Sequence, residues 1–256
     1  MDTTIPYHTR MASAALLAAR DPNMEIVQIV SFGCGHDAII SDEMSRVMRE
    51  VSGREPLILK LDEGEAVGPI NIRIKSFIET IRSKREKDKK ATIPQKLKEL
   101  KNAFVSKYIR RHRKEKIILT PNLSPAFTYL ASGILNTLGY RVMPMPLADD
   151  RAFELGKKFV HNDICFPAQV NIGEALSLLE KGTYSPDEVA IGLAKNCDDC
   201  RAGQYSGLAR KALDEAGYPQ IPIITTGEDT KNIHPGFKIG IRFQIRSLWG
   251  ICIVDG

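Results

Sequence analysis

The chain has 256 residues, 43% of them hydrophobic and 26% charged, with a formal net charge of +5, which is the composition of a folded globular protein. It contains no apolar run of about eighteen residues, so we expect no membrane-spanning helix. The N-terminus has an acidic second residue and only a short apolar stretch, unlike a secretory signal peptide, so we expect a cytosolic protein.

The first 82 residues alternate short β-branched runs with longer stretches of helical periodicity. This alternation is typical of α/β architecture with mostly parallel strands, and we interpret residues 1–82 as a first α/β lobe. The first predicted elements are a helix at 7–20, a buried strand at 25–31 and a helix that is capped by Ser41 or Asp42 and reaches Val51 before Gly53. A strand at 56–61 and a loop containing Gly64 and Gly68 follow. The last predicted element is a helix at 70–81, whose apolar stripe consists of Ile70, Ile74, Phe77, Ile78 and Ile81.

The basic charge of the chain is concentrated in the next segment. Residues 82–116 contain 15 Lys and Arg against 4 Asp and Glu, so the rest of the chain is net acidic. Nucleic-acid-binding segments usually interleave aromatic side chains with their charges, and here only Phe104 and Tyr108 are present. We therefore interpret residues 83–115 as a solvated connector, partly helical from Pro94, or as a docking face for an acidic partner, and we expect no nucleic-acid binding.

The alternation of strands and helices resumes in residues 116–256, which we interpret as a second α/β lobe. The predicted elements are a strand at 116–120, helices at 125–138, 149–160 and 168–181, strands at 140–145 and 189–194, a helix ending near Ala216 and a strand at 221–225, with Gly139, Gly182 and Gly217 ending three of the helices. The apolar C-terminal tail carries no capping signal and looks truncated, so we expect the chain to be part of a longer protein.

Three of the five cysteines occupy turns next to predicted strands or helices. Cys34 follows the first strand, Cys200 follows the strand at 189–194, and Cys165 precedes a helix that Pro167 can start. Because the turns after parallel strands emerge at one edge of a sheet, two facing lobes could bring these thiols together. Helix N-termini and glycine-containing loops stabilise thiolates and can donate hydrogen bonds to cluster sulfurs, so this arrangement indicates a metal site.

Other roles for the cysteines stay open. A buried cysteine is commonly just a small apolar side chain, which is how we interpret Cys252 within WGICIV, and it is an alternative for the others. Cys197 and Cys200 form a CxxC that could be half of a zinc site or a redox pair. Neither a second CxxC nor a closely spaced His pair accompanies it, and the intervening Asp198 and Asp199 would raise a thiol pKa, which disfavours a thioredoxin-like role.

Four stretches resemble a known family: VSFGCGHDAIISDE, LKLDEGEAVGPINIRIKSFIE, FVHNDICFPAQVNIGEAL and CRAGQYSGLARKALDEAGYPQIPIIT. Together they span roughly residues 7–226 and resemble the C-terminal region of the large 2-hydroxyacyl-CoA dehydratase activase-related proteins, which is itself related to the dehydratase subunits. The resemblance implies two Rossmann-like lobes around an oxygen-sensitive 4Fe–4S cluster that receives low-potential electrons from an ATP-hydrolysing activase domain or subunit. It also implies an acyl-CoA-type substrate, and we expect a homo-oligomer.

By the same resemblance, Cys34, Cys165 and Cys200 match the cluster ligands of the family. The run NCDDC departs from the glycine-rich pattern of the family, so Cys197 is an additional cysteine that could supply a fourth ligand. The chain has no Walker-type phosphate loop, and no ATPase activity is expected from it alone. The expected function is electron relay or one-electron reductive chemistry; the alternative is a partner-docking scaffold, without catalysis, that holds a structural zinc or no metal.

Four further residues are candidates for the surroundings of the cluster. His36 follows Cys34 by two residues and could be a neighbour of the cluster or an alternative ligand, and Arg201 could offset the negative charge of bound thiolates. Glu63 could be a ligand or a proton carrier, or simply an acid at a helix N-terminus. His161 could shuttle protons or donate a hydrogen bond to a loop carbonyl.

Overall fold

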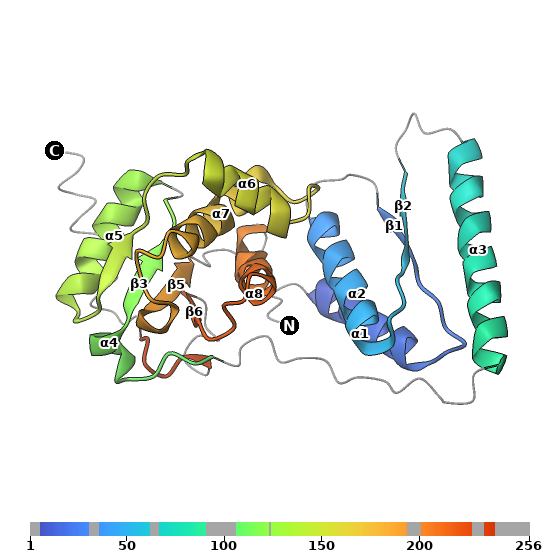
Figure 1. The fold of residues 1–256 in the computed structure, drawn as a ribbon, viewed down its shortest axis with the longest axis horizontal. Helices are drawn as coiled ribbons and strands as arrows, with labels where there is room; N and C mark the ends of the chain where they lie inside the picture. The colour runs from blue at the N-terminus through green and yellow to red at the C-terminus, as the bar shows by residue number, and fades with distance from the viewer. Residues whose placement is uncertain are drawn as a thin grey trace. The chain divides into compact units, whose positions relative to one another are not determined.

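The computed structural model describes residues 6–30, 36–61, 67–90, 106–122, 124–193, 201–226 and 233–238 (Figure 1). These residues form two compact units, one within 6–90 and the other within 106–238, and each unit is described by itself. Both units are mixed α/β with parallel strand pairs, as predicted. Among these residues, no helix combines the length and the apolar character needed to cross a bilayer.

The first unit places a two-stranded parallel sheet beside two packed helices. Its elements are α1 (Pro6–Arg20), β1 (Val27–Val30), α2 (His36–Ser52), β2 (Leu57–Lys60) and α3 (Val67–Lys90). Apolar residues at helical spacing along α2, including Ile40, Met44 and Met48, pack against Ala15 and Ala19 of α1. This α1–α2 core stabilises the packing of the two helices, because burying such side chains is the main favourable contribution to folding.

The predicted start of α2 and the predicted burial of β1 are wrong. The helix α2 begins at His36, so Ser41 lies inside it and is buried instead of capping its N-terminus. The apolar face of the helix includes Ile39 and Ile40, and burying this face favours a start before the local capping signal. The strand predicted to be buried is buried on one face only, since Val27 and Ile29 are 51% and 64% exposed.

The helix α3 is longer than predicted. Its predicted stripe of Ile70, Ile74, Phe77 and Ile81 is partly buried, but Ile78 is exposed. The helix begins at Val67, so Gly68 lies in its first turn and not in a loop, and it continues through the basic residues to Lys90. Lysine, arginine and glutamate are good helix formers, which explains the extension. The helix expected from Pro94 lies outside the described residues.

The second unit contains a four-stranded parallel sheet in the order β4-β3-β5-β6. Its elements are α4 (His112–Glu115), β3 (Ile117–Thr120), α5 (Pro125–Thr137), β4 (Val142–Pro144), α6 (Asp150–Phe159), α7 (Phe166–Glu180), η1 (Pro186–Glu188), β5 (Val189–Leu193), η2 (Arg201–Gln204), α8 (Tyr205–Glu215) and β6 (Ile223–Thr225). All the strands and helices predicted for residues 116–225 are confirmed in kind, with ends that differ by a few residues. Gly139 and Gly182 follow α5 and α7 with φ of 86° and 67°, the left-handed conformation that glycine favours.

The centre of the second unit is formed by the two inner strands and the helix α7. Leu119 of β3 and Ile191 of β5 are almost completely buried, as expected for the inner strands of a parallel sheet. The helix α7 lies beside α6 (Figure 1) and is buried along most of its length. The two helices approach so closely that a Cβ atom built on Gly173 would lie 1.9 Å from the carbonyl oxygen of Ala152. The second unit therefore has a closely packed centre, and Cys165 lies at the N-terminus of its buried helix.

Candidate functional site

Cys165 is the cysteine that the described residues include, and it lies near the carboxyl edge of the four-stranded sheet. Because the strands are parallel, the segments that follow them leave the sheet at one edge. The helix α8 follows β5, so its first residue, Tyr205, lies at that edge. The Sγ atom of Cys165 is 2.9 Å from the Oη atom of Tyr205, which places the N-terminus of α7 at the same edge.

Cys165 is the N-cap residue of α7, and Pro167 lies in the first turn, as predicted. The cysteine is half-buried, and Tyr205 beside it is 5% exposed. The partial positive charge of a helix N-terminus suits the negative charge of a metal-bound thiolate. Tyr205 was not predicted as a site residue. The feature that could have indicated it is a polar aromatic side chain five positions after Cys200, in CRAGQY.

Several predicted site residues lie outside the described residues: Cys34, Glu63, Cys197 and Cys200, together with Cys252. Arg201 begins η2, and its side chain is outside the described part. Within the described residues, no three His, Cys, Asp or Glu side chains are grouped so that they could hold a metal ion. The ligand set of the predicted cluster is therefore represented in the structure by Cys165.

The two predicted histidines occupy different units. His36 begins α2 in the first unit, and its ring centroid is 5.1 Å from that of His8. His8 is 5% exposed; its burial and the nearby His36 lower the pKa of His8, and Asp37 acts in the opposite direction. No signal in the sequence singled out His8. His161, in the second unit, is exposed, and its Nδ1 atom accepts a hydrogen bond from the backbone N–H of Asp163.

Glu174 of α7 has a buried carboxyl group that connects this helix to the segments following β3 and β4. Glu174 is 5% exposed, and its Oε2 atom accepts a hydrogen bond of 3.0 Å from the backbone N–H of Asn122, which follows β3. Burial raises the pKa of Glu174, and hydrogen bonds from the backbone N–H groups of Asn122 and Ala148 oppose this rise. In the sequence this residue resembled any solvent-facing glutamate of a helix, so its role was missed.

This raised pKa predicts how the free energy of unfolding changes with pH. A carboxyl group whose pKa is higher in the folded protein than its ordinary value of 4.5 stabilises the fold fully below that value. The contribution of Glu174 is lost as the pH rises through the folded-state pKa. Urea unfolding of wild type and Glu174→Gln between pH 4 and pH 7 should therefore show the stability of wild type falling relative to the variant as the pH rises.

The control for this pH experiment is Glu180→Gln. A hydrogen bond from Arg151 lowers the pKa of Glu180, so its small contribution is present above the ordinary pKa and is lost as the pH falls. The two variants should therefore show pH dependences of opposite sign. A stability of wild type that rises with pH relative to Glu174→Gln would contradict the effect of burial at this position.

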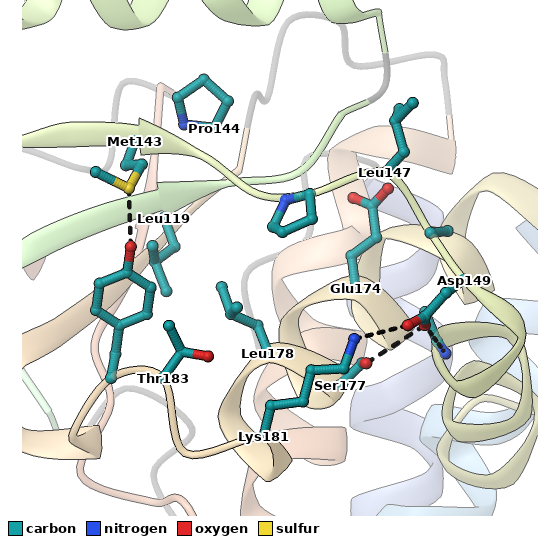
Figure 2. A pocket seen from close by; sticks show the side chains of 14 residues that line it. Leu119, Met143, Pro144, Leu147, Asp149, Glu174, Ser177, Leu178, Lys181 and Thr183 are labelled. Carbon is teal, nitrogen blue, oxygen red and sulfur yellow. Dashed lines mark hydrogen bonds and ion pairs between the residues drawn. The ribbon is translucent and has the colours of Figure 1, made fainter.

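A pocket of about 250 Å³ lies between β4, the segment after it, and the C-terminal half of α7 (Figure 2). Its apolar lining includes Leu119 of β3 and Leu178 of α7. An ion pair of 2.6 Å between Lys181 and Asp149 borders it, and Asp149 also caps α6 through the backbone N–H of Ala152. The pocket was not predicted, because its lining is assembled from segments far apart in the sequence.

No protein-family model matches the chain, and neither the curated proteins nor the solved structures contain a match to it.

Proposed function

We propose that the protein binds a 4Fe–4S cluster through Cys34, Cys165 and Cys200, with Cys197 as the candidate fourth ligand. In this proposal the two units are Rossmann-like lobes. The protein acts in a system that resembles the 2-hydroxyacyl-CoA dehydratases and their activases, where it relays low-potential electrons or carries out one-electron reductive chemistry.

The contact between Cys165 and Tyr205 is the observation that supports this proposal best. Tyr205 lies five residues after Cys200 in the sequence, and the intervening Arg201–Gln204 is the short helix η2. A residue extends the chain by at most about 3.6 Å, and by about 2 Å in a 3₁₀ helix. Since Cys165 is hydrogen-bonded to Tyr205, the short chain between Tyr205 and Cys200 limits how far Cys200 can be from Cys165. Cys197 belongs to the same segment as Cys200.

The chemistry of these side chains fits the proposed cluster. Thiolates are the ligands that iron–sulfur clusters prefer, and a bound cluster would supply one-electron transfer. The hydroxyl group of Tyr205 can donate a hydrogen bond to the sulfur of Cys165, and hydrogen bonds of this kind tune the reduction potential of a bound cluster. Cys34 lies outside the described residues, and its contribution is tested directly by the variants below.

The same proposal assigns partners to the protein. By the family resemblance, low-potential electrons would come from an ATP-hydrolysing activase domain or subunit, and the sequence of this chain has no Walker-type loop of its own. An acyl-CoA-type compound is the proposed substrate, and the proposed assembly is a homo-oligomer.

Anaerobic reconstitution with iron and sulfide tests this function. Wild type should bind both elements and show broad visible absorbance, and Cys34→Ala, Cys165→Ala and Cys200→Ala should each lose most of that absorbance because a ligand is missing. Cys252→Ala is the matched control and should retain it. Wild type that stays colourless and iron-free after reconstitution would disprove the proposed function, and retention of the cluster by all three ligand variants would disprove the ligand assignment.

A second candidate function, a docking scaffold without catalysis that binds a structural zinc or no metal, is favoured by one feature of the first unit. The described side chains of α3 from Arg82 to Lys87 are all exposed, and four of these six residues are basic. Such a helix could bind an acidic partner surface. Stoichiometric zinc, or no metal at all, in anaerobically purified and reconstituted protein would favour this second function.

A further inference from the structure

The pocket beside β4 has a hydrocarbon interior that continues onto the surface. Leu119, Leu178 and Ala152 line it and are at most 7% exposed. Met143 and Leu147 also belong to its lining and are 44% and 69% exposed. Pockets that bind small molecules are typically apolar with a few polar groups that fix the orientation of the ligand. A ligand of this pocket should therefore carry a hydrocarbon group.

A hydroxyl donor in the lining has a weak partner. The Oη atom of Tyr184 is 2.8 Å from the Sδ atom of Met143, and a thioether sulfur is a weak hydrogen-bond acceptor. A carbonyl oxygen is a stronger acceptor, so exchanging the sulfur for a ligand carbonyl would improve this hydrogen bond. The hydroxyl of Tyr184 can thus orient a ligand that presents a carbonyl oxygen.

The charged groups of the pocket favour a neutral ligand. The Nζ atom of Lys181 is 2.6 Å from the Oδ2 atom of Asp149, so these two charges already compensate each other. The remaining acidic group of the lining is Glu174, which is 5% exposed and already accepts a hydrogen bond from the backbone N–H of Asn122. A charged ligand would lose its hydration without gaining an unpaired counter-ion.

We propose that this pocket binds a small neutral carbonyl compound with a short hydrocarbon chain, such as an amide, a ketone or an ester, whose carbonyl oxygen accepts a hydrogen bond from Tyr184. The hydrocarbon chain lies against Leu119 and Leu178. All the lining residues belong to the second unit. This binding site is independent of the proposed cluster and of its ligands, so either proposal can fail without the other.

Titration of isotopically labelled protein with isobutyramide, followed by amide chemical shifts, tests this site. A ligand of this size should bind with an affinity in about the millimolar range and shift the backbone amides of Lys181, Thr183 and Tyr184 in a saturable way. Tyr184→Phe keeps the ring and removes the donor, so it should weaken binding by about 3- to 10-fold. Tyr129→Phe changes an exposed tyrosine of α5 outside the pocket lining and should leave the affinity unchanged.

Isobutyrate, a carboxylate of nearly the same shape, distinguishes a neutral ligand from an anionic one. We expect it to bind more weakly than isobutyramide at pH 7. Equal or tighter binding of isobutyrate would overturn the assignment of a neutral ligand. Absence of saturable shifts at the pocket amides, or an unchanged affinity in Tyr184→Phe, would overturn the proposed site itself.

Discussion

Replacing Gly173 with alanine is expected to lower the free energy of unfolding of the second unit by about 3 kcal/mol or more. A Cβ atom on this residue would lie 1.9 Å from the carbonyl oxygen and 2.8 Å from the carbonyl carbon of Ala152 in α6. These are backbone atoms of a helix and cannot rotate away, so α6 and α7 must separate. Urea unfolding followed by circular dichroism would measure the change in midpoint and slope.

The matched control for this prediction is Gly207→Ala in α8. A Cβ atom on this exposed glycine would meet no atom within 4 Å. Alanine favours helix more than glycine does, so the control should raise the free energy of unfolding by up to about 1 kcal/mol. If both variants destabilised the protein equally, the close approach of α6 and α7 could not be the cause. Gly156→Ala, whose Cβ would lie 2.2 Å from the carbonyl oxygen of Gln169, should reproduce the effect of Gly173→Ala.

The order and type of the elements in the second unit could be predicted because their signals are local. The strand at 117–120 is a short β-branched run, and glycines such as Gly139 mark the ends of helices where a left-handed conformation is needed. The N-cap position of Cys165 was also predictable, since proline is favoured in the first turn of a helix. Such signals depend on a few neighbouring residues and not on the rest of the fold.

The start of α2 and the exposed face of β1 could not be predicted, because they depend on what each element packs against. Ser41 has the chemistry of a cap, but the neighbouring apolar residues are buried against α1, and their burial decides the start of the helix. The alternation of β1 leaves Ile29 exposed and Gln28 buried, which is the reverse of what side-chain polarity favours. We have no physical account of the burial of Gln28.

The contacts of the candidate site were also beyond prediction, because they join residues distant in the sequence. Tyr205 is 40 residues from Cys165, and the partner of Glu174 is a backbone N–H group 52 residues away. Gly173 resembles an ordinary helix glycine until Ala152 is placed beside it. A sequence pattern identifies the faces that pack, but the crossing of two helices selects which atoms meet.

Replacing Arg210 with methionine should lower the free energy of unfolding of the second unit by about 2 to 4 kcal/mol. Arg210 is 4% exposed, and its guanidinium group donates hydrogen bonds to the carbonyl oxygens of Tyr218 and Ile221, at 2.9 Å and 2.5 Å. These carbonyl groups lie between α8 and β6. Methionine would preserve much of the packing and leave both carbonyl oxygens without this donor, a loss measurable by urea unfolding.

Two further variants separate the role of these carbonyl groups from that of the ion pair of Arg210 with Asp214. Arg210→Lys keeps the charge but not the planar group that reaches two acceptors, so its loss of stability should be intermediate. Arg151→Met removes an exposed arginine bonded to Glu180 and should cost less than about 1 kcal/mol. If Arg210→Lys were as stable as wild type, the ion pair with the half-exposed Asp214 would account for the stabilising effect of Arg210. The hydrogen bonds to Tyr218 and Ile221 would then not stabilise the segment between α8 and β6.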